Sequence, residues 1–386
     1  MKKMPDNLSI YIHYPFCKAK CPYCDFNSHI MEVNNDADWQ KAYISELEYF
    51  LEFTKNSKIS TIFFGGGTPS LMPISLIEAI LNKIYALYKV APDVEISLEA
   101  NPTSSEALKF QNFKSLGINR LSIGVQSLID EDLKFLGRKH SASEALKTIE
   151  TAKKYFNNFS FDLIYARPKQ TLKSWEKELK QALKLDPPHL SLYQLTIEKG
   201  TEFFNLYRDK KFKLADQEKL ADFYELTDSI CANANLIKYE TSNYAKKEFE
   251  AKHNLNYWLY GDYIGIGAGA HARITQFDSE KHYFMTFHNP LKWLNKTLES
   301  GNGIQQKKIL TKEEIIEEIL MNGLRINKAI SKNIFEKYIG KNHIVLFGSK
   351  LDDLRDEGLI LYDADKILTT NKGAKILNSI ITYLVS

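Results

Sequence analysis

Three cysteines near the start of the chain have a spacing that suits metal-cluster chemistry. Cys17, Cys21 and Cys24 form a Cys-x3-Cys-x2-Cys pattern, whereas the fourth cysteine, Cys231, lies far away in the sequence. Thiolates at this spacing, on a loop just past a strand-like run, can converge on one iron–sulfur cluster. A 4Fe–4S cluster held by three cysteines leaves one iron open. The pattern therefore indicates a reactive cluster whose open iron can hold a substrate or cofactor.

Structural zinc is the alternative reading of the same cysteines. Zinc in a structural site is normally held by four Cys or His ligands, and a second cysteine pair is absent from the chain. His13 or His29 could complete a Cys3His site, so ligand count disfavours zinc without excluding it. The sequence around the cysteines, with Lys18 and Lys20, does not read as a buried apolar face.

The elements that must position these cysteines follow from the hydrophobic pattern. Short apolar runs alternate with longer stretches of helical spacing over the first 235 residues. We expect strands at 8–14, 59–64, 94–100, 119–125, 159–165 and 189–195. We expect helices at about 36–53, 73–88, 104–116, 143–155, 172–185 and 216–236. Six strand–helix units predict an α/β fold, a partial (β/α)6 TIM-like barrel, with an open doubly wound sheet as the alternative.

Polar residues mark the ends of several expected strands. Three glycines and a threonine, 65–68, follow the second strand, and consecutive glycine N–H groups can cradle a carboxylate. Glu99 and Gln126 close the third and fourth strands, and Asp162 lies inside the apolar fifth, where a charge needs a partner. A parallel barrel places its active site at the C-terminal ends of its strands. We therefore expect these groups to border one site.

The sequence pattern changes after residue 236. Residues from about 237 to 273 are denser in aromatics and glycine. Residues 237–306 are predicted to link the barrel, residues 1–236, to a C-terminal domain, residues 307–386. The linking region contains His253-Asn-Leu-Asn-Tyr257-Trp258 and a glycine-rich loop at 265–270. That loop fits a dinucleotide fingerprint only superficially, because no obvious helix follows it. The C-terminal pattern of helices and a short hairpin predicts a small, mainly helical, winged-helix-like domain.

Charge, cysteine content and the length of the apolar runs limit the classes of protein to which the chain can belong. The 386 residues carry 51 Lys and Arg against 48 Asp and Glu, and this net charge of +3 is too small to predict a nucleic-acid partner. Four cysteines without spaced pairs argue against a disulfide scaffold and for a cytoplasmic protein. The apolar runs are far shorter than the roughly 20 residues of a membrane helix. Peripheral contact with the inner face of the membrane stays open.

The segment Tyr11-Ile-His-Tyr-Pro-Phe-Cys17 and the cysteine spacing after it resemble the radical S-adenosylmethionine (SAM) superfamily. The oxygen-independent coproporphyrinogen III oxidase group is the most similar, and the resemblance covers nearly the whole chain. It implies an electron donor and a 4Fe–4S cluster with three Cys ligands, whose open iron chelates SAM for cleavage to a 5′-deoxyadenosyl radical. It assigns nine residues to the SAM pocket: Tyr11, Tyr23, Gly66, Gly67, Thr68, Glu99, Gln126, Arg138 and Asp162.

Two features favour the haem-chaperone (HemW) branch of this group. Phe26 stands where the oxidases carry a further cysteine, and the HNxxYW segment at 253–258 resembles the haem-binding motif of that branch. The resemblance implies haem as cargo, with His253 as a candidate ligand and Tyr257 and Trp258 as flat apolar faces. The acceptors would be haem proteins, membrane-bound respiratory proteins among them. The alternatives are an oxidase that decarboxylates coproporphyrinogen III to protoporphyrinogen IX and a structural zinc protein that acts through interactions.

Overall fold

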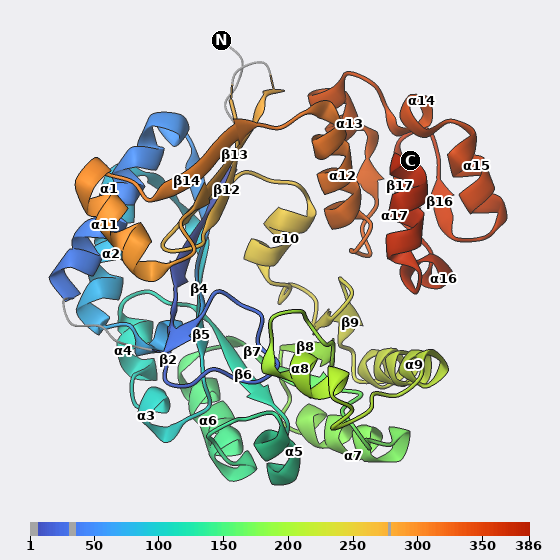
Figure 1. The fold of residues 1–386 in the computed structure, drawn as a ribbon, viewed down its shortest axis with the longest axis horizontal. Helices are drawn as coiled ribbons and strands as arrows, with labels where there is room; N and C mark the ends of the chain where they lie inside the picture. The colour runs from blue at the N-terminus through green and yellow to red at the C-terminus, as the bar shows by residue number, and fades with distance from the viewer. Residues whose placement is uncertain (1–6, 31–35, 277–278) are drawn as a thin grey trace.

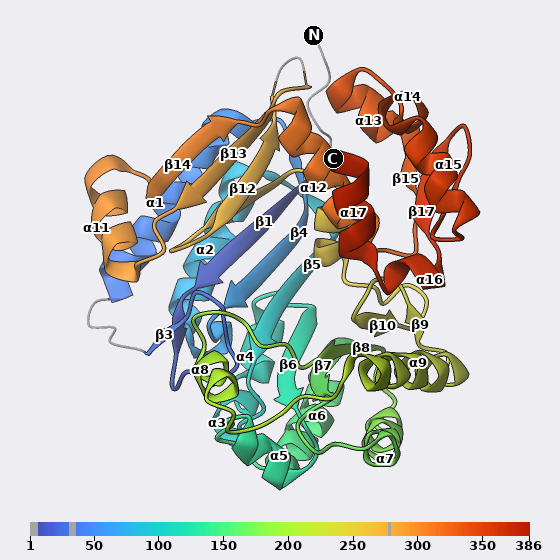
Figure 2. The same cartoon turned by 45° about the vertical axis from the view of Figure 1, so that its right-hand side comes forward.

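The computed structural model describes residues 7–30, 36–276 and 279–386, and its centre is a parallel sheet. Six strands lie side by side in the order in which they occur in the chain, which confirms the predicted partial (β/α)6 barrel (Figures 1 and 2). They are β1 (Asn7–Tyr14), β4 (Lys58–Gly66), β5 (Lys89–Ala100), β6 (Arg120–Gln126), β7 (Asn158–Tyr165) and β8 (His189–Gln194). Their side chains are almost continuously buried, as expected for parallel strands covered on both faces.

Helices connect the parallel strands and cover the outside of the sheet (Figure 2). The crossover helices are α1 (Asp36–Thr54), α2 (Ile74–Leu87), α3 (Ser104–Ala107), α4 (Phe110–Ser115), α6 (Ala142–Tyr155), α7 (Leu172–Leu183) and α9 (Gln217–Asn233). The single helix expected at 104–116 is therefore two helices. The Glu106 carboxylate accepts a hydrogen bond from the Asn101 backbone N–H, and the Lys109 ammonium donates to the Ser70 carbonyl. These two bonds anchor the chain on both sides of the break between α3 and α4.

Several short elements surround the crossovers and were not expected from the pattern. The cysteine loop contains β2 (Phe16–Cys17) and β3 (His29–Ile30), which pair in parallel. A 3-10 turn, η1 (Pro69–Leu71), follows the glycine run. Helices α5 (Asp130–Phe135) and α8 (Glu202–Arg208) extend the loops after β6 and β8.

Residues 237–306 enlarge the sheet at both edges. Beside β8 lie β10 (Asn243–Ala245) and β9 (Ile237–Lys238). At the other edge β11 (Tyr263–Ile266) pairs in parallel with β1, and three antiparallel strands follow: β12 (His271–Thr275), β13 (Lys281–Thr286) and β14 (Ile304–Ile309). Helix α10 (Lys252–Trp258) carries the HNxxYW segment, and α11 (Pro290–Ser300) packs against α1. A strand, and no helix, follows the glycine-rich loop.

The C-terminal residues have an apolar core of their own. Buried side chains of residues 310–384 gather with Tyr260 in a cluster separate from the barrel core. Its helices are α12 (Lys312–Gly323), α13 (Lys332–Ile339), α14 (His343–Phe347), α15 (Ser349–Asp356), α16 (Asn371–Ala374) and α17 (Leu377–Val385). Its strands, β15 (Ile330–Ser331), β17 (Lys366–Thr369) and β16 (Ile360–Tyr362), form a small sheet in that order. The domain boundaries at 236 and 306 stay a prediction.

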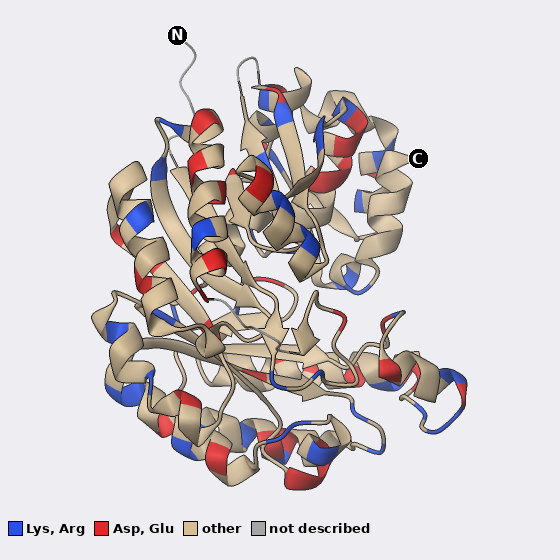
Figure 3. Ribbon diagram, turned by 60° about the vertical axis from the view of Figure 1, so that its left-hand side comes forward, with Lys and Arg blue, Asp and Glu red and all other residues tan. Residues whose placement is uncertain are grey.

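Positions of Lys and Arg and positions of Asp and Glu are spread along the helices and intermingled, without a large region of one sign in this view (Figure 3). This distribution fits the small net charge of the chain. Among the described residues, no helix combines the length and apolarity needed to cross a membrane.

Candidate functional site

A cavity of about 210 Å³ lies where the strands β4 to β7 end and the cysteine loop folds over them. Most of the predicted site residues line it, although they come from segments spread over 146 positions of the chain. The members of the predicted set in this wall are Cys17, Cys21, Tyr23, Cys24, Gly66, Gly67, Thr68, Glu99, Gln126, Arg138 and Asp162. Of the residues predicted for the cluster and SAM, Tyr11 is the exception, because it lines a neighbouring, larger cavity. These residues therefore line one cavity, as expected from their positions at the ends of strands.

Hydrogen-bond donors point at the cysteine sulfurs. The Thr68 hydroxyl lies 3.3 Å from Cys17 Sγ, and the Arg138 guanidinium lies 3.4 Å from Cys21 Sγ. Such donors stabilise thiolates and tune a cluster that the thiolates hold. The donor set of three thiols on one cavity, with the partly buried Arg138 guanidinium beside them, fits an iron–sulfur cluster.

Asn101 connects these two donors, and the sequence analysis missed it. Its side-chain N–H donates to the Thr68 hydroxyl at 3.1 Å, and its side-chain oxygen accepts from the Arg138 guanidinium at 2.5 Å. Arg138 also donates to the Gly124 carbonyl at 2.7 Å. By composition Arg138 looked like a surface loop residue, but these bonds hold it in the cavity wall. The position of Asn101, just past the strand that Glu99 closes, is the signal that could have identified it.

Two carboxyls sit together in the floor of the smaller cavity. Burial, and then the charge of Asp162, raises the pKa of Glu99 to about 8, although the Gly66 N–H donates to this carboxyl at 3.1 Å. Burial also raises the pKa of Asp162 to about 6, against a hydrogen bond from Ser191 and the charge of Arg120. One oxygen of Asp162, Oδ1, is buried and has no hydrogen-bond partner among the described residues. An acceptor left unpaired inside a cavity fits a cofactor that carries N–H or O–H donors, as SAM does.

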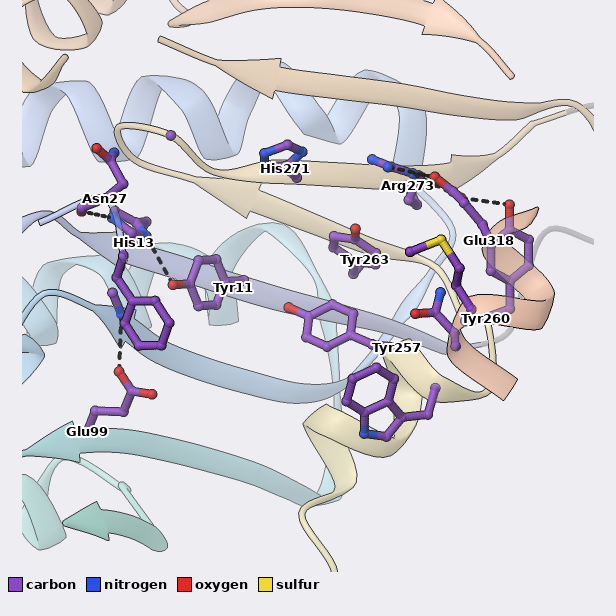
Figure 4. A pocket seen from close by; sticks show the side chains of 17 residues that line it. Tyr11, His13, Asn27, Glu99, Tyr257, Tyr260, Tyr263, His271, Arg273 and Glu318 are labelled. Atoms are coloured by element: carbon purple, nitrogen blue, oxygen red, sulfur yellow. Dashed lines mark hydrogen bonds and ion pairs between the residues drawn. The ribbon is translucent and has the colours of Figure 1, made fainter. Parts of the chain in front are cut away.

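The larger cavity, of about 640 Å³, lies between the sheet and the C-terminal domain (Figure 4). Strands β1, β11 and β12, helix α10 and helix α12 all contribute to its wall. Its Phe, Tyr and Trp side chains are Tyr11, Phe26, Tyr257, Trp258, Tyr260 and Tyr263. Phe26, Gly66 and Glu99 line both cavities, so the two spaces adjoin. A cavity of this volume, with several aromatic side chains in its wall, suits a large flat ligand.

The three residues predicted to bind haem occupy different positions relative to this cavity. Tyr257 and Trp258 line it, whereas His253 lies behind them and is only 1% exposed. The His253 ring is bonded at both nitrogens, with Nδ1 at 2.7 Å from the Thr61 hydroxyl and Nε2 at 2.8 Å from the Tyr257 hydroxyl. Burial lowers the pKa of His253 to about 3. Haem ligation by His253 stays a prediction, and it requires one of these bonds to open.

The wall of β12 contributes a second histidine and an arginine, which the sequence analysis did not single out. Arg273 forms a two-pronged ion pair with Glu318 of α12, with N···O distances of 2.7 and 2.9 Å, and the Tyr260 hydroxyl donates to the same carboxylate at 2.9 Å (Figure 4). His271 lines the same cavity. Burial, followed by the charge of Arg273, lowers the pKa of His271 to about 4, so its imidazole is neutral near pH 7.

The glycine-rich loop at 265–270 is fixed from two sides. The Asn27 amide, from the cysteine loop, donates to the Ala268 carbonyl at 2.9 Å and to the His288 carbonyl at 3.0 Å. On the other side the Glu46 carboxylate, fully buried on α1, accepts hydrogen bonds from the Gly267 N–H at 2.8 Å and the Trp293 indole at 3.0 Å. These contacts hold the edge of the larger cavity against the cysteine loop.

The histidines considered for a zinc site have other partners. His13 Nε2 lies 2.9 Å from the Asn27 carbonyl and must donate to it, so Nδ1 accepts from the Tyr11 hydroxyl at 3.0 Å. His29 Nε2 lies 3.1 Å from the Asn27 side-chain oxygen. Over the described ranges, no group of three or more His, Cys, Asp or Glu side chains is placed to hold a single metal ion.

Comparisons with known proteins agree with this architecture. The radical SAM superfamily matches residues 11–182, and the HemN C-terminal domain matches residues 310–375. The crystal structure of coproporphyrinogen III oxidase (HemN) from Escherichia coli superposes with a TM-score of 0.82, over 100% of this chain and 91% of that one. At 22% sequence identity this match shows a shared fold.

Proteins related in sequence match this chain over all or most of their length. The heme chaperone HemW of Haemophilus influenzae is 38% identical over 392 residues, and that of Escherichia coli is 37% identical over 389 residues, with 100% of each chain covered. Radical S-adenosyl methionine domain-containing protein 1, mitochondrial, of Bos taurus is 32% identical, over 98% of this chain and 87% of the relative. The radical SAM family implies a 4Fe–4S cluster and SAM. The chain therefore belongs to the radical SAM superfamily, and within it to the HemW family.

Proposed function

We propose that this protein binds haem and delivers it to haem-accepting proteins, as a haem chaperone built on a radical SAM scaffold. The observation that carries the proposal is the full-length similarity to relatives named heme chaperone HemW. The larger cavity supplies a place for the cargo, because its aromatic side chains can lie against a porphyrin. The acceptors are haem proteins, including respiratory proteins in the membrane.

Cys17, Cys21 and Cys24 would hold the 4Fe–4S cluster, with SAM in the smaller cavity. When bound, this pair supplies one-electron chemistry, fed by an external electron donor. The residues around it bind and orient. Thr68 and Arg138 donate hydrogen bonds to the sulfurs, and the unpaired oxygen of Asp162 can accept one from the cofactor. The predicted SAM residues stay a prediction in their individual roles.

Coproporphyrinogen oxidation is the second candidate, because the HemN fold extends over the whole chain. The residue that argues against it is Phe26, at the position where the oxidases carry a further cysteine. Phe26 is 61% exposed and lines both cavities. It therefore occupies the passage between cluster and cargo with an apolar ring, which offers no thiol for redox or proton transfer.

An anaerobic side-by-side assay separates these functions. The purified protein, reconstituted with iron and sulfide, is titrated with haem and, in parallel, incubated with coproporphyrinogen III, SAM and a reductant. We expect saturable haem binding, transfer of the bound haem to haem-depleted respiratory membranes, and no protoporphyrinogen. Failure to bind haem overturns the proposal, and protoporphyrinogen formation establishes the oxidase. Zinc in place of iron and sulfide, found by metal analysis of the anaerobic protein, would contradict the cluster.

A further inference from the structure

His253, the candidate iron ligand on α10, is held in place by side chains of the barrel strands. Its backbone N–H and that of Lys252 donate to the Glu95 carboxylate of β5 at 3.1 and 3.3 Å, which fixes the start of α10. The imidazole stacks on the ring of Phe63 of β4, with the two centroids 5.0 Å apart. These contacts fix both the backbone position and the plane of the imidazole.

Two buried hydroxyls decide which nitrogen of this ring carries the proton. Ser9 of β1 and Thr61 of β4 are direct partners in the parallel pairing of the two strands, and both are buried. The Thr61 hydroxyl donates its proton to Ser9 Oγ at 2.7 Å, so it is an acceptor towards His253 Nδ1, which also lies at 2.7 Å. Nδ1 must then carry the proton. The lone pair on Nε2 accepts from the Tyr257 hydroxyl at 2.8 Å.

We propose that Ser9 and Thr61 are positioning residues that hold His253 in the tautomer whose Nε2 can ligate haem iron. The Tyr257 hydroxyl covers that nitrogen until haem binds. The inference rests on the proposed function, because it takes haem as the cargo and the histidine of the HNxxYW segment as its ligand. A histidine that ligates a metal usually donates its other ring N–H to an acceptor, which fixes the tautomer. Thr61 is such an acceptor, although it lies outside the HNxxYW segment.

Tyr257 is placed to act as the cover. It lies one helical turn after His253, and the two rings meet edge to face with their centroids 5.0 Å apart. Tyr257 lines the larger cavity, whereas His253 does not (Figure 4). Rotation of the Tyr257 side chain breaks one hydrogen bond and uncovers Nε2, while the bond from Nδ1 to Thr61 stays in place. In the haem-free protein the cover keeps a buried lone pair hydrogen-bonded.

The tautomer is measured without haem. The cluster-loaded protein is labelled with 15N-histidine, and nuclear magnetic resonance signals of the His253 ring are assigned by their loss in His253→Gln. We expect a protonated Nδ1 and an unprotonated Nε2 in the parent. Ser9→Ala frees the Thr61 hydroxyl to donate to Nδ1, and Thr61→Val removes the acceptor, so both variants should move the proton to Nε2. A proton on Nε2 in the parent, or an unchanged tautomer in both variants, overturns the positioning role.

An anaerobic titration with ferric haem tests the consequence for binding. Thr61→Val should lower haem affinity about tenfold, whereas Thr61→Ser, which keeps the hydroxyl, should match the parent. Thr227→Val is the matched control, because the buried Thr227 hydroxyl of α9 accepts from the Trp175 indole at 2.8 Å and donates to the Phe223 carbonyl at 2.7 Å. Thr227 lines neither cavity, so this variant should keep the parent's affinity. Equal losses in Thr61→Val and Thr227→Val assign Thr61 to the fold alone and overturn its positioning role.

Tyr257→Phe tests the cover, because it removes the hydroxyl and keeps the ring. Haem affinity should rise about fivefold, since no hydrogen bond at Nε2 has to be broken. The histidine-ligated absorbance and electron paramagnetic resonance spectra should stay as in the parent. Weaker binding, or loss of those spectra, overturns the covering role.

Failure of the proposed function gives a different result. A parent protein that binds no haem overturns that function, and haem binding that His253→Gln leaves unchanged overturns His253 as the ligand. In either case the tautomer measurement on the haem-free protein still tests what Ser9 and Thr61 do to the His253 ring.

Discussion

The two cavities share a wall but are built in different ways. The smaller one is formed by one sheet and the loops after its strands, and its wall is dominated by groups that hydrogen-bond one another, such as Thr68, Asn101 and Arg138. The larger one needs three separate segments, the strand edge, α10 and α12, and six Phe, Tyr and Trp side chains contribute to its wall. The proposed cofactor cavity is thus fixed by one sheet and its loops, whereas the proposed cargo cavity depends on how the C-terminal domain packs against the sheet.

The largest effect is expected when the cluster is removed and the larger cavity is left intact. Cys17→Ala should abolish iron and sulfide incorporation on anaerobic reconstitution, because two thiolates cannot complete the ligand set that three provide. Haem affinity should stay within about twofold, since Cys17 does not line the larger cavity. Iron and sulfide content and a haem titration measure the two effects. Cys231→Ala is the matched control, with a buried cysteine of α9 removed and the cluster kept. Equal iron loss in both variants would show a folding defect instead.

The second prediction disturbs the larger cavity and spares the smaller. The two oxygens of Glu46 accept N–H groups from Gly267, Gly303 and Trp293. In Glu46→Gln an NH2 group replaces one of the two carboxylate oxygens. Because both oxygens accept hydrogen bonds, this NH2 group must face at least one buried N–H donor. The free energy of unfolding should fall by about 2 kcal/mol, and haem affinity should fall while iron content persists. Urea unfolding and haem titration provide the measurements.

Glu48→Gln, on the same helix but about half exposed and paired with Lys83, should change stability by less than about 0.5 kcal/mol. Similar losses in both variants would contradict the role given to Glu46.

The third prediction concerns the carboxyls of the smaller cavity. Because the folded pKa of Glu99 is about 8, above its ordinary value of 4.5, its contribution to stability is complete below about pH 4.5 and is lost as the pH rises to about 8. Glu99→Gln resembles the neutral carboxyl and cannot titrate. The stability difference between parent and variant should therefore fall by a few kcal/mol over this window and level off above it. Urea unfolding from pH 4.5 to 9 measures it, and a constant difference would refute the pKa shift.

The smallest effect is expected at the boundary of the cavities. Phe26→Ala should leave stability nearly unchanged, because the ring is 61% exposed, and should weaken haem binding about fivefold through the loss of an aromatic face. Leu108→Ala, which removes an 82% exposed side chain outside both cavities, is the control in the same titration. Unchanged haem affinity in Phe26→Ala would mean that the cargo does not reach this ring.

The barrel and the position of the cluster loop could be predicted from the sequence pattern alone. Apolar runs alternating with helical stretches specify successive parallel strands, and the ends of such strands meet at one edge whatever the rest of the chain does. This is why the sequence alone predicts that Gly66, Glu99, Gln126 and Asp162 border one site. The missed helix break near Glu106 shows the limit, because side-chain anchors to other loops decided it.

Which side chains face the larger cavity depends on contacts between segments that lie far apart in the sequence. His253 and His271 look alike in the sequence, and the motif favours the first, yet hydrogen bonds to Thr61 and Tyr257 enclose it. The wall of the larger cavity is completed by Glu318 and Met321 of α12, about 45 positions beyond β12. Spacing within a segment determines which thiols can share a cluster. Contacts between segments distant in sequence determine which imidazoles are enclosed by hydrogen bonds, as that of His253 is, and the sequence pattern does not encode those contacts.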